Sequence, residues 1–146
     1  MGDTIKLYTV GYIAGWTPAA LLEKAKDLGA IVYDSRIRPY SRQPEWNQKA
    51  LQSLLGSRYV HADGLGNVNY KGGPIKLQNP APWIERIATS IHPVILLCAC
   101  GNPSVCHRTV IADMLKQQHG MEYRHLFPER KRVSGGGAPP SQLKLF

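Results

Sequence analysis

Short apolar runs alternate along the chain with stretches in which apolar residues recur at helical spacing. The clearest run is 94–97, Val-Ile-Leu-Leu, which follows Pro93 and contains two β-branched residues. Such a run is typical of a strand buried on both faces, as in a parallel sheet. A turn-forming Gly-Asn-Pro-Ser cluster comes next, and helical spacing begins at Val105. The pattern predicts strand, turn and helix, with Ser104 as the helix N-cap.

The same alternation extends over most of the chain. Thr17 followed by Pro18 is typical of a helix start, and Gly29 is typical of a helix end. Further strands are expected at 5–10, 30–33, 58–62 and 122–127, and further helices at 18–28, 45–55 and 83–91. This order predicts a three-layer, Rossmann-like α/β domain with a mainly parallel sheet of about five strands.

Three reactive side chains follow the 94–97 strand directly. Cys106, His107 and Arg108 fall in the first turn of the expected helix, beyond the carboxyl end of a central strand, where open α/β sheets bind ligands. Free N–H groups there attract anions and lower the pKa of a thiol. We expect an active site with Cys106 as nucleophile or polar wall, His107 as acid or base, and Arg108 stabilising negative charge.

A second polar segment, 34–42, leaves the 30–33 strand at the same sheet edge. Its three arginines suit phosphate or carboxylate, although a solvated loop in which Asp34 pairs with one arginine also fits. Aromatic side chains nearby can stack on a base. The expected phosphate- or DNA-binding residues are Arg36, Arg38, Ser41, Arg42, Tyr12, Tyr40 and Lys71.

The Gly- and Asn-rich segment 63–74 has no periodicity. A loop of this length in a small domain is often functional, and His61, Asp63 and Asn69 can reach the expected site from it. A simple connection fits the segment equally well.

The composition of the chain indicates the kind of partner that the protein binds. The chain of 146 residues carries a formal charge of +8, which favours an anionic partner, with nucleic acid as the default. An odd number of cysteines, three, argues against a disulfide framework. Without a long apolar run or secretory segment, we expect a soluble, cytoplasmic, nucleoid-associated protein with no membrane contact.

The sequence changes character near residue 129. Residues 1–128 are expected to form the globular domain, and 129–141 a basic, then Gly/Pro/Ser-rich linker. The chain ends in QLKLF at 142–146, which resembles the motif by which bacterial replication and repair proteins bind the sliding clamp, the DNA polymerase processivity factor. The resemblance implies that the clamp-binding residues are Gln142, Leu143, Leu145 and Phe146.

The globular part resembles the bacterial and phage family described as domain of unknown function 488. The matching residues are TVGY at 9–12, the loop residues Asp34, Arg36, Pro39, Ser41 and Arg42, and the block at 96–108 that ends in Cys-His-Arg. Ser35 stands where the family usually has valine. The resemblance implies an α/β fold and these site residues, but no settled reaction.

The cysteines also suggest other chemistries. The Cys-His-Arg triplet has a much shorter resemblance to DNA alkyltransferases, whereas the spacing excludes a phosphatase or rhodanese loop. A zinc site from Cys98, Cys100, Cys106 and His107 has suitable ligand types. However, Cys98 and Cys100 lie on alternate positions of a strand, closer together than the ligands of structural zinc sites usually are. They are therefore expected to be small core residues. No metal and no cofactor are therefore expected.

Together these features predict a DNA-maintenance protein recruited to the sliding clamp. The favoured hypothesis is an enzyme acting on damaged or modified DNA bases or nucleotides, by base hydrolysis or cysteine-dependent dealkylation. One alternative is a non-catalytic adaptor that binds DNA lesions. The other is a soluble nucleotide-metabolising enzyme whose clamp-like end is coincidental.

Overall fold

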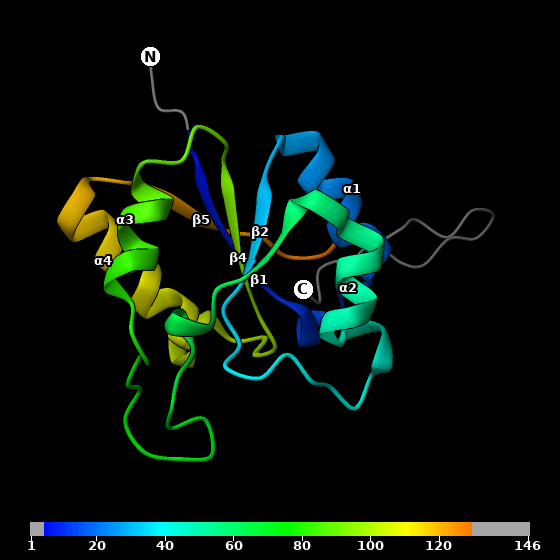
Figure 1. Ribbon diagram of the computed structural model, residues 1–146, viewed down its shortest axis with the longest axis horizontal. Helices are drawn as coiled ribbons and strands as arrows, with labels where there is room; N and C mark the ends of the chain where they lie inside the picture. Colours follow the sequence, from blue (N-terminus) through cyan, green and yellow to red (C-terminus); the bar gives the residue numbers. More distant parts are fainter. Residues whose placement is uncertain (1–4, 130–146) are drawn as a thin grey trace, which may run out of the picture.

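The computed structural model describes residues 5–129, which form a five-stranded parallel sheet between two pairs of helices (Figure 1). Every strand pair is parallel, and the strand order is β3-β2-β4-β1-β5. The expected three-layer α/β fold is therefore confirmed. The strands are β1 (Leu7–Gly11), β2 (Ile31–Asp34), β3 (Tyr59–His61), β4 (Val94–Cys98) and β5 (Tyr123–His125). The α-helices are α1 (Pro18–Leu28), α2 (Gln48–Leu55), α3 (Ala81–Ala88) and α4 (His107–His119).

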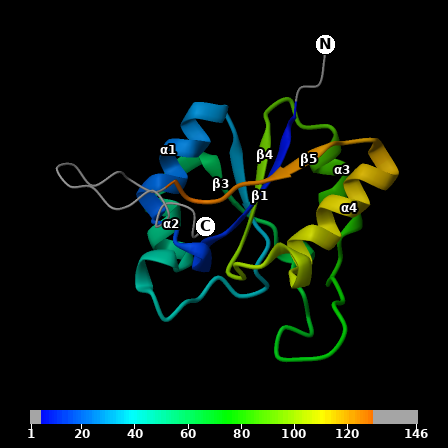
Figure 2. The same cartoon turned by 180° about the vertical axis from the view of Figure 1, so that it is seen from behind.

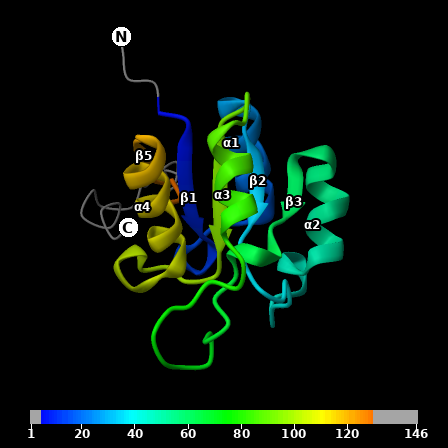
Figure 3. The same ribbon diagram turned by 60° about the vertical axis from the view of Figure 1, so that its left-hand side comes forward.

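The unbroken apolar run of β4 is explained by a core on each side of the sheet. Ile95 and Leu97 pack in the cluster that includes residues of α1 and α2, whereas Val94 and Leu96 pack with residues of α3 and α4. Figures 2 and 3 show the two helix pairs on opposite faces. Because both faces of the central strand are covered, neither set of alternate positions can be polar.

Some element ends differ from the expectation. Helix α1 begins after the Thr17 cap and ends at Gly29 in the left-handed conformation, as predicted. Helix α4, however, begins at His107, and its N-cap is Cys106 rather than Ser104. Residues Pro103–Val105 instead form a 3-10 turn, since the Asn102 side chain accepts the Ser104 N–H. Similarly, a separate 3-10 turn at Pro44–Trp46 delays the start of α2.

The strand order opens a crevice at the carboxyl edge of the sheet. Strands β2 and β4 are neighbours, but β2 leads to α2 on one face and β4 leads to α4 on the other. At such a switch point the two connections diverge, and a ligand can sit between them. The loops that follow β1 and β3 begin at the same edge because all strands are parallel. Among residues 5–129, no helix has the length and apolar character needed to span a bilayer.

Candidate functional site

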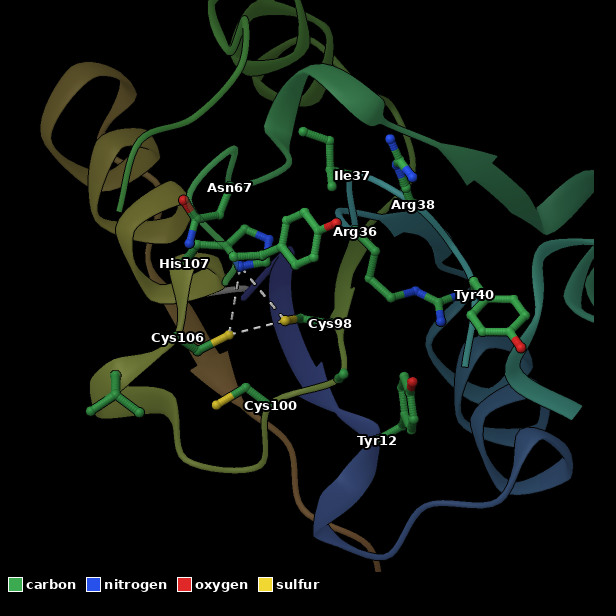
Figure 4. Close-up of a pocket in the computed structure, with 13 residues that line it drawn as sticks. Tyr12, Arg36, Ile37, Arg38, Tyr40, Asn67, Cys98, Cys100, Cys106 and His107 are labelled. Atoms are coloured by element: carbon green, nitrogen blue, oxygen red, sulfur yellow. Dashed lines mark hydrogen bonds between the residues drawn. The ribbon is translucent and has the colours of Figure 1, made fainter. Parts of the chain in front are cut away.

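A pocket of about 400 Å³ lies at this carboxyl edge (Figure 4). Residues that follow β1, β2, β3 and β4 all line it, so the arginine segment and the Cys106 turn share one cavity, as the sequence predicts. The lining residues are Tyr12, Arg36, Ile37, Arg38, Tyr40, Asn67, Tyr70, Cys98, Ala99, Cys100, Val105, Cys106 and His107.

Two thiols and an imidazole meet on one side of the pocket. The Cys106 Sγ lies 3.1 Å from the Cys98 Sγ, and the His107 Nδ1 lies 3.7 Å from Cys98 Sγ and 4.0 Å from Cys106 Sγ. On the other side of the ring, His107 Nε2 is 2.8 Å from the carbonyl oxygen of Ser35. A carbonyl only accepts, so Nε2 carries the proton and the Nδ1 lone pair faces the sulfur atoms.

The two thiols behave as a coupled pair. The thiol of Cys106 donates to Cys98, and this hydrogen bond lowers the pKa of Cys98. The same hydrogen bond, together with burial, raises the pKa of Cys106 to about 12. The neighbouring sulfur and burial therefore outweigh the effect of the helix N-terminus that was expected to lower the pKa of Cys106. Cys106 lines the pocket, and its role as nucleophile or polar wall stays a prediction. Cys98, which was expected to be a small core residue, is the thiol whose pKa is lowered.

Arg108 does not line the pocket but contacts residues next to it. Its side chain is buried, with Nε donating to the Thr9 hydroxyl and Nη1 donating to the Cys100 carbonyl at 2.5 Å. Gly11 is needed at this point because a β-carbon there would lie 1.7 Å from the Cys100 oxygen. The Thr-Val-Gly-Tyr and Cys-His-Arg segments thus meet in one packed contact. The expected anion-binding role of Arg108 is not supported by its position.

The Arg36 side chain also forms buried contacts within the protein. Its guanidinium forms a two-point ion pair with the buried carboxylate of Asp34, at 2.8 and 2.7 Å, and also donates to the Trp46 carbonyl. Burial by itself disfavours the charged form, but the hydrogen bonds and charge of Asp34 outweigh it and raise the pKa of Arg36. Tyr59 completes the group by donating to Asp34. The alternative in which Asp34 pairs with one arginine is thus confirmed for Arg36.

The remaining expected DNA-binding residues divide into two groups. Arg38 and Tyr40 are exposed and line the pocket, whereas Ser41, Arg42 and Lys71 do not line it. Tyr12 lines the pocket, but its ring is mostly buried, stacked on Trp46 at 4.3 Å between centroids. The expected clamp-binding residues, 142–146, lie outside the described residues.

Several lining residues were not anticipated. The 63–74 segment contributes Asn67 and Tyr70, although Asn69 bonds within its own loop, to the Pro74 carbonyl. His61 bonds the Arg36 carbonyl at 2.8 Å and so holds the arginine segment from β3. Cys98 is the final residue of β4. Its place in the site was detectable in principle, because the last residue of a central parallel strand borders the ligand crevice.

Comparison with known proteins identifies one family. The model of a family described as "Domain of unknown function DUF488" matches residues 18–115, which include the arginine segment and the Cys-His-Arg turn. No curated protein matches the chain, and no solved structure matches it.

Proposed function

The chain belongs to the DUF488 family, and from its pocket we propose that it is a DNA-maintenance protein that binds a damaged or modified nucleotide unit of DNA and acts on it. The observation that carries the proposal is the single cavity shared by the arginine segment and the Cys-Cys-His cluster. Its volume of about 400 Å³ falls in the range of small-molecule sites. We further propose that the QLKLF end recruits the protein to the sliding clamp.

The residues around the pocket suit a nucleotide. Tyr40 and Tyr70 are 76% and 55% exposed, so their rings are free to stack on an extruded base. Arg38 is exposed and lines the same pocket, so its guanidinium can contact a phosphate. The formal charge of +8 favours approach to DNA as a whole. Stacking and phosphate contact therefore come from different residues, so single variants can test each contribution to binding.

Two reactions remain open for this site. In base hydrolysis, Nδ1 of His107 would accept a proton from a water as its oxygen forms a bond to the sugar carbon that carries the base. The bond between that carbon and the base would break with its electron pair, and then a proton, going to the released base. In dealkylation, the Cys98 sulfur would attack the alkyl carbon of a damaged base, forming an S–C bond while the bond between the carbon and the base breaks. The pKa of Cys98, lowered by the Cys106 hydrogen bond, favours this sulfur as the nucleophile.

The second candidate is a non-catalytic adaptor that binds DNA lesions. It is favoured by Arg108, whose guanidinium is buried against the Thr9 hydroxyl and the Cys100 carbonyl and does not line the pocket, so it is not placed to stabilise a reacting group. The variant Cys98→Ser separates the adaptor from a dealkylating enzyme, and His107→Gln separates it from a base hydrolase. An enzyme loses turnover in the corresponding variant and keeps DNA binding, whereas an adaptor keeps both its DNA binding and its function in cells.

We predict that Arg38→Ala weakens binding to a short DNA duplex containing a modified base. The logarithmic slope of affinity against salt concentration should fall by about one unit, because one phosphate contact is lost. Tyr40→Ala should weaken binding by about 1–3 kcal/mol without changing that slope, since stacking releases no counterions. Fluorescence anisotropy at several salt concentrations measures both effects.

Lys26→Ala is the matched control, because Lys26 is exposed in the last turn of α1, near the start of β2 and away from the pocket. It removes the same charge as Arg38→Ala. If the two variants have equal affinity and equal salt slope, the pocket does not bind the DNA and the proposal is wrong.

A further inference from the structure

The Cys98, Cys106 and His107 cluster has a composition typical of transition-metal sites. One ligand-type atom from each residue, two Sγ and one Nδ1, lies within 4.8 Å of the others. Thiolate and imidazole are the ligands that Zn²⁺ and similar soft or borderline ions prefer. The cluster also joins three parts of the fold, since Cys98 ends β4, His107 begins α4, and Ser35 after β2 holds the imidazole.

The spacing of the three atoms is close to that of a tetrahedral site. With Zn–S near 2.3 Å and Zn–N near 2.0 Å, a tetrahedral ion holds S and N about 3.6 Å apart and S and S about 3.8 Å apart. The observed S–N distances are 3.7 and 4.0 Å, and the S–S distance is 3.1 Å. Ion binding therefore requires the sulfur atoms to separate by roughly 0.7 Å, which small side-chain rotations supply.

The orientation of His107 is the feature that most favours a metal. Histidine ligands usually donate their second ring N–H to a carbonyl or carboxylate, which fixes the tautomer and directs the other nitrogen at the metal. In this protein Nε2 donates to the Ser35 carbonyl at 2.8 Å. The lone pair of Nδ1 is thereby directed at the two sulfur atoms. An ordinary buried pair of thiols does not need this arrangement.

We propose that Cys98, Cys106 and His107 form a binding site for one Zn²⁺ ion or a similar divalent transition metal, with a fourth position open to the pocket. All three residues line the cavity, so water or a ligand atom can complete the coordination. Cys100 is outside the set, because its Sγ lies against the Asn102 carbonyl. The site thus differs from the four-residue zinc site expected as one alternative from the sequence. A bound ion occupies Nδ1 of His107, so metal binding and the use of that atom as a base are alternatives.

The test uses the full chain, fully reduced, titrated with Co²⁺ as a spectroscopic substitute for Zn²⁺. We expect one Co²⁺ per chain, a thiolate-to-cobalt charge-transfer band, and the visible bands of a tetrahedral ion. Cys98→Ser and Cys106→Ser should each weaken binding by at least about tenfold and reduce the charge-transfer band. Cys100→Ser and His119→Ala are the matched controls, since they remove a thiol and an imidazole outside the cluster, and they should bind as the wild type does.

A second measurement keeps the proposal testable if a cysteine variant does not fold. In the wild type, Zn²⁺ should slow alkylation of Cys98 and Cys106 and leave Cys100 reacting at its original rate. The proposal is overturned if the reduced wild type shows no thiolate-to-cobalt band. It is equally overturned if that band persists at full strength in folded Cys98→Ser and Cys106→Ser, or if Zn²⁺ protects none of the thiols.

Discussion

Arg36 lines the pocket and also forms a buried ion pair that supports the fold. The carboxylate of Asp34 is fully buried, and its partners are the Arg36 guanidinium and the Tyr59 hydroxyl. A buried charge of this kind is tolerated only with such partners. The pair turns the Arg36 side chain inward and so determines the path of the segment that presents Arg38 and Tyr40 to the pocket.

Arg36→Ala is therefore predicted to destabilise the fold. It leaves the Asp34 carboxylate buried without its cationic partner, which should lower the free energy of unfolding by about 3–5 kcal/mol. Urea denaturation measures this change. Arg42→Ala, at an exposed position of the same segment, should change the free energy by no more than about 0.5 kcal/mol. A folded Arg36→Ala protein of wild-type stability that fails only to bind DNA would assign Arg36 to the ligand instead.

At the scale of elements, β1, α4 and β5 are joined by a chain of side chains. The Thr9 hydroxyl lies 2.6 Å from His125 Nδ1 and accepts the Arg108 Nε–H at 3.1 Å. Burial, followed by the nearby positive charge of Arg108, lowers the pKa of His125. This chain connects the edge strand to the helix whose first turn forms the site, so the stability of β5 and the position of α4 are linked.

This contact predicts a pH-dependent loss of stability. Because the pKa of His125 is lower in the folded than in the unfolded state, the unfolded chain takes up a proton first as the pH falls below about 6.5. The free energy of unfolding should therefore decrease as the pH falls through about 6.5, until folded His125 is itself protonated. Urea denaturation across this range should give a shallower decrease for His125→Gln. Parallel curves for the two proteins would contradict the assignment.

At the scale of the whole molecule, the strand order places every functional loop on one side. The connections after β1, β2, β3 and β4 all contribute to the pocket, and the two helix pairs lie on opposite faces of the sheet (Figure 3). The opposite edge carries the turns that begin the strands. A domain of this form can take one ligand at one edge while remaining attached to a partner by another part of its chain.

Deleting residues 142–146 is predicted to abolish co-purification with a bacterial sliding clamp. The apolar residues of QLKLF should supply the contact, and the described domain should keep its DNA affinity, because the two attachments are separate. Pull-down with purified clamp and anisotropy with DNA measure the two properties. A variant with Lys144→Ala, which leaves the expected anchor residues unchanged, is the matched control. Unchanged clamp binding after the deletion would remove recruitment from the proposed function.

The sequence by itself determined the order of the elements and the edge at which the site lies. Apolar periodicity and end signals such as Thr17 and Gly29 act within a few neighbouring residues, so they can be read locally. The shared edge of the arginine segment and the Cys106 turn also follows from the sequence, because parallel strands place their carboxyl ends together.

Only the tertiary structure decided which side chains enter the pocket. Arg108 points away from it because Thr9 and the Cys100 carbonyl, distant along the chain or across the turn, accept its N–H groups. Cys98 lines the pocket because it ends β4 at the carboxyl edge, but its contact with the Cys106 sulfur at 3.1 Å depends on the path of the turn after β4. The direction of a polar side chain depends on partners supplied by other elements. Local sequence patterns carry no information about those partners until the sheet has formed.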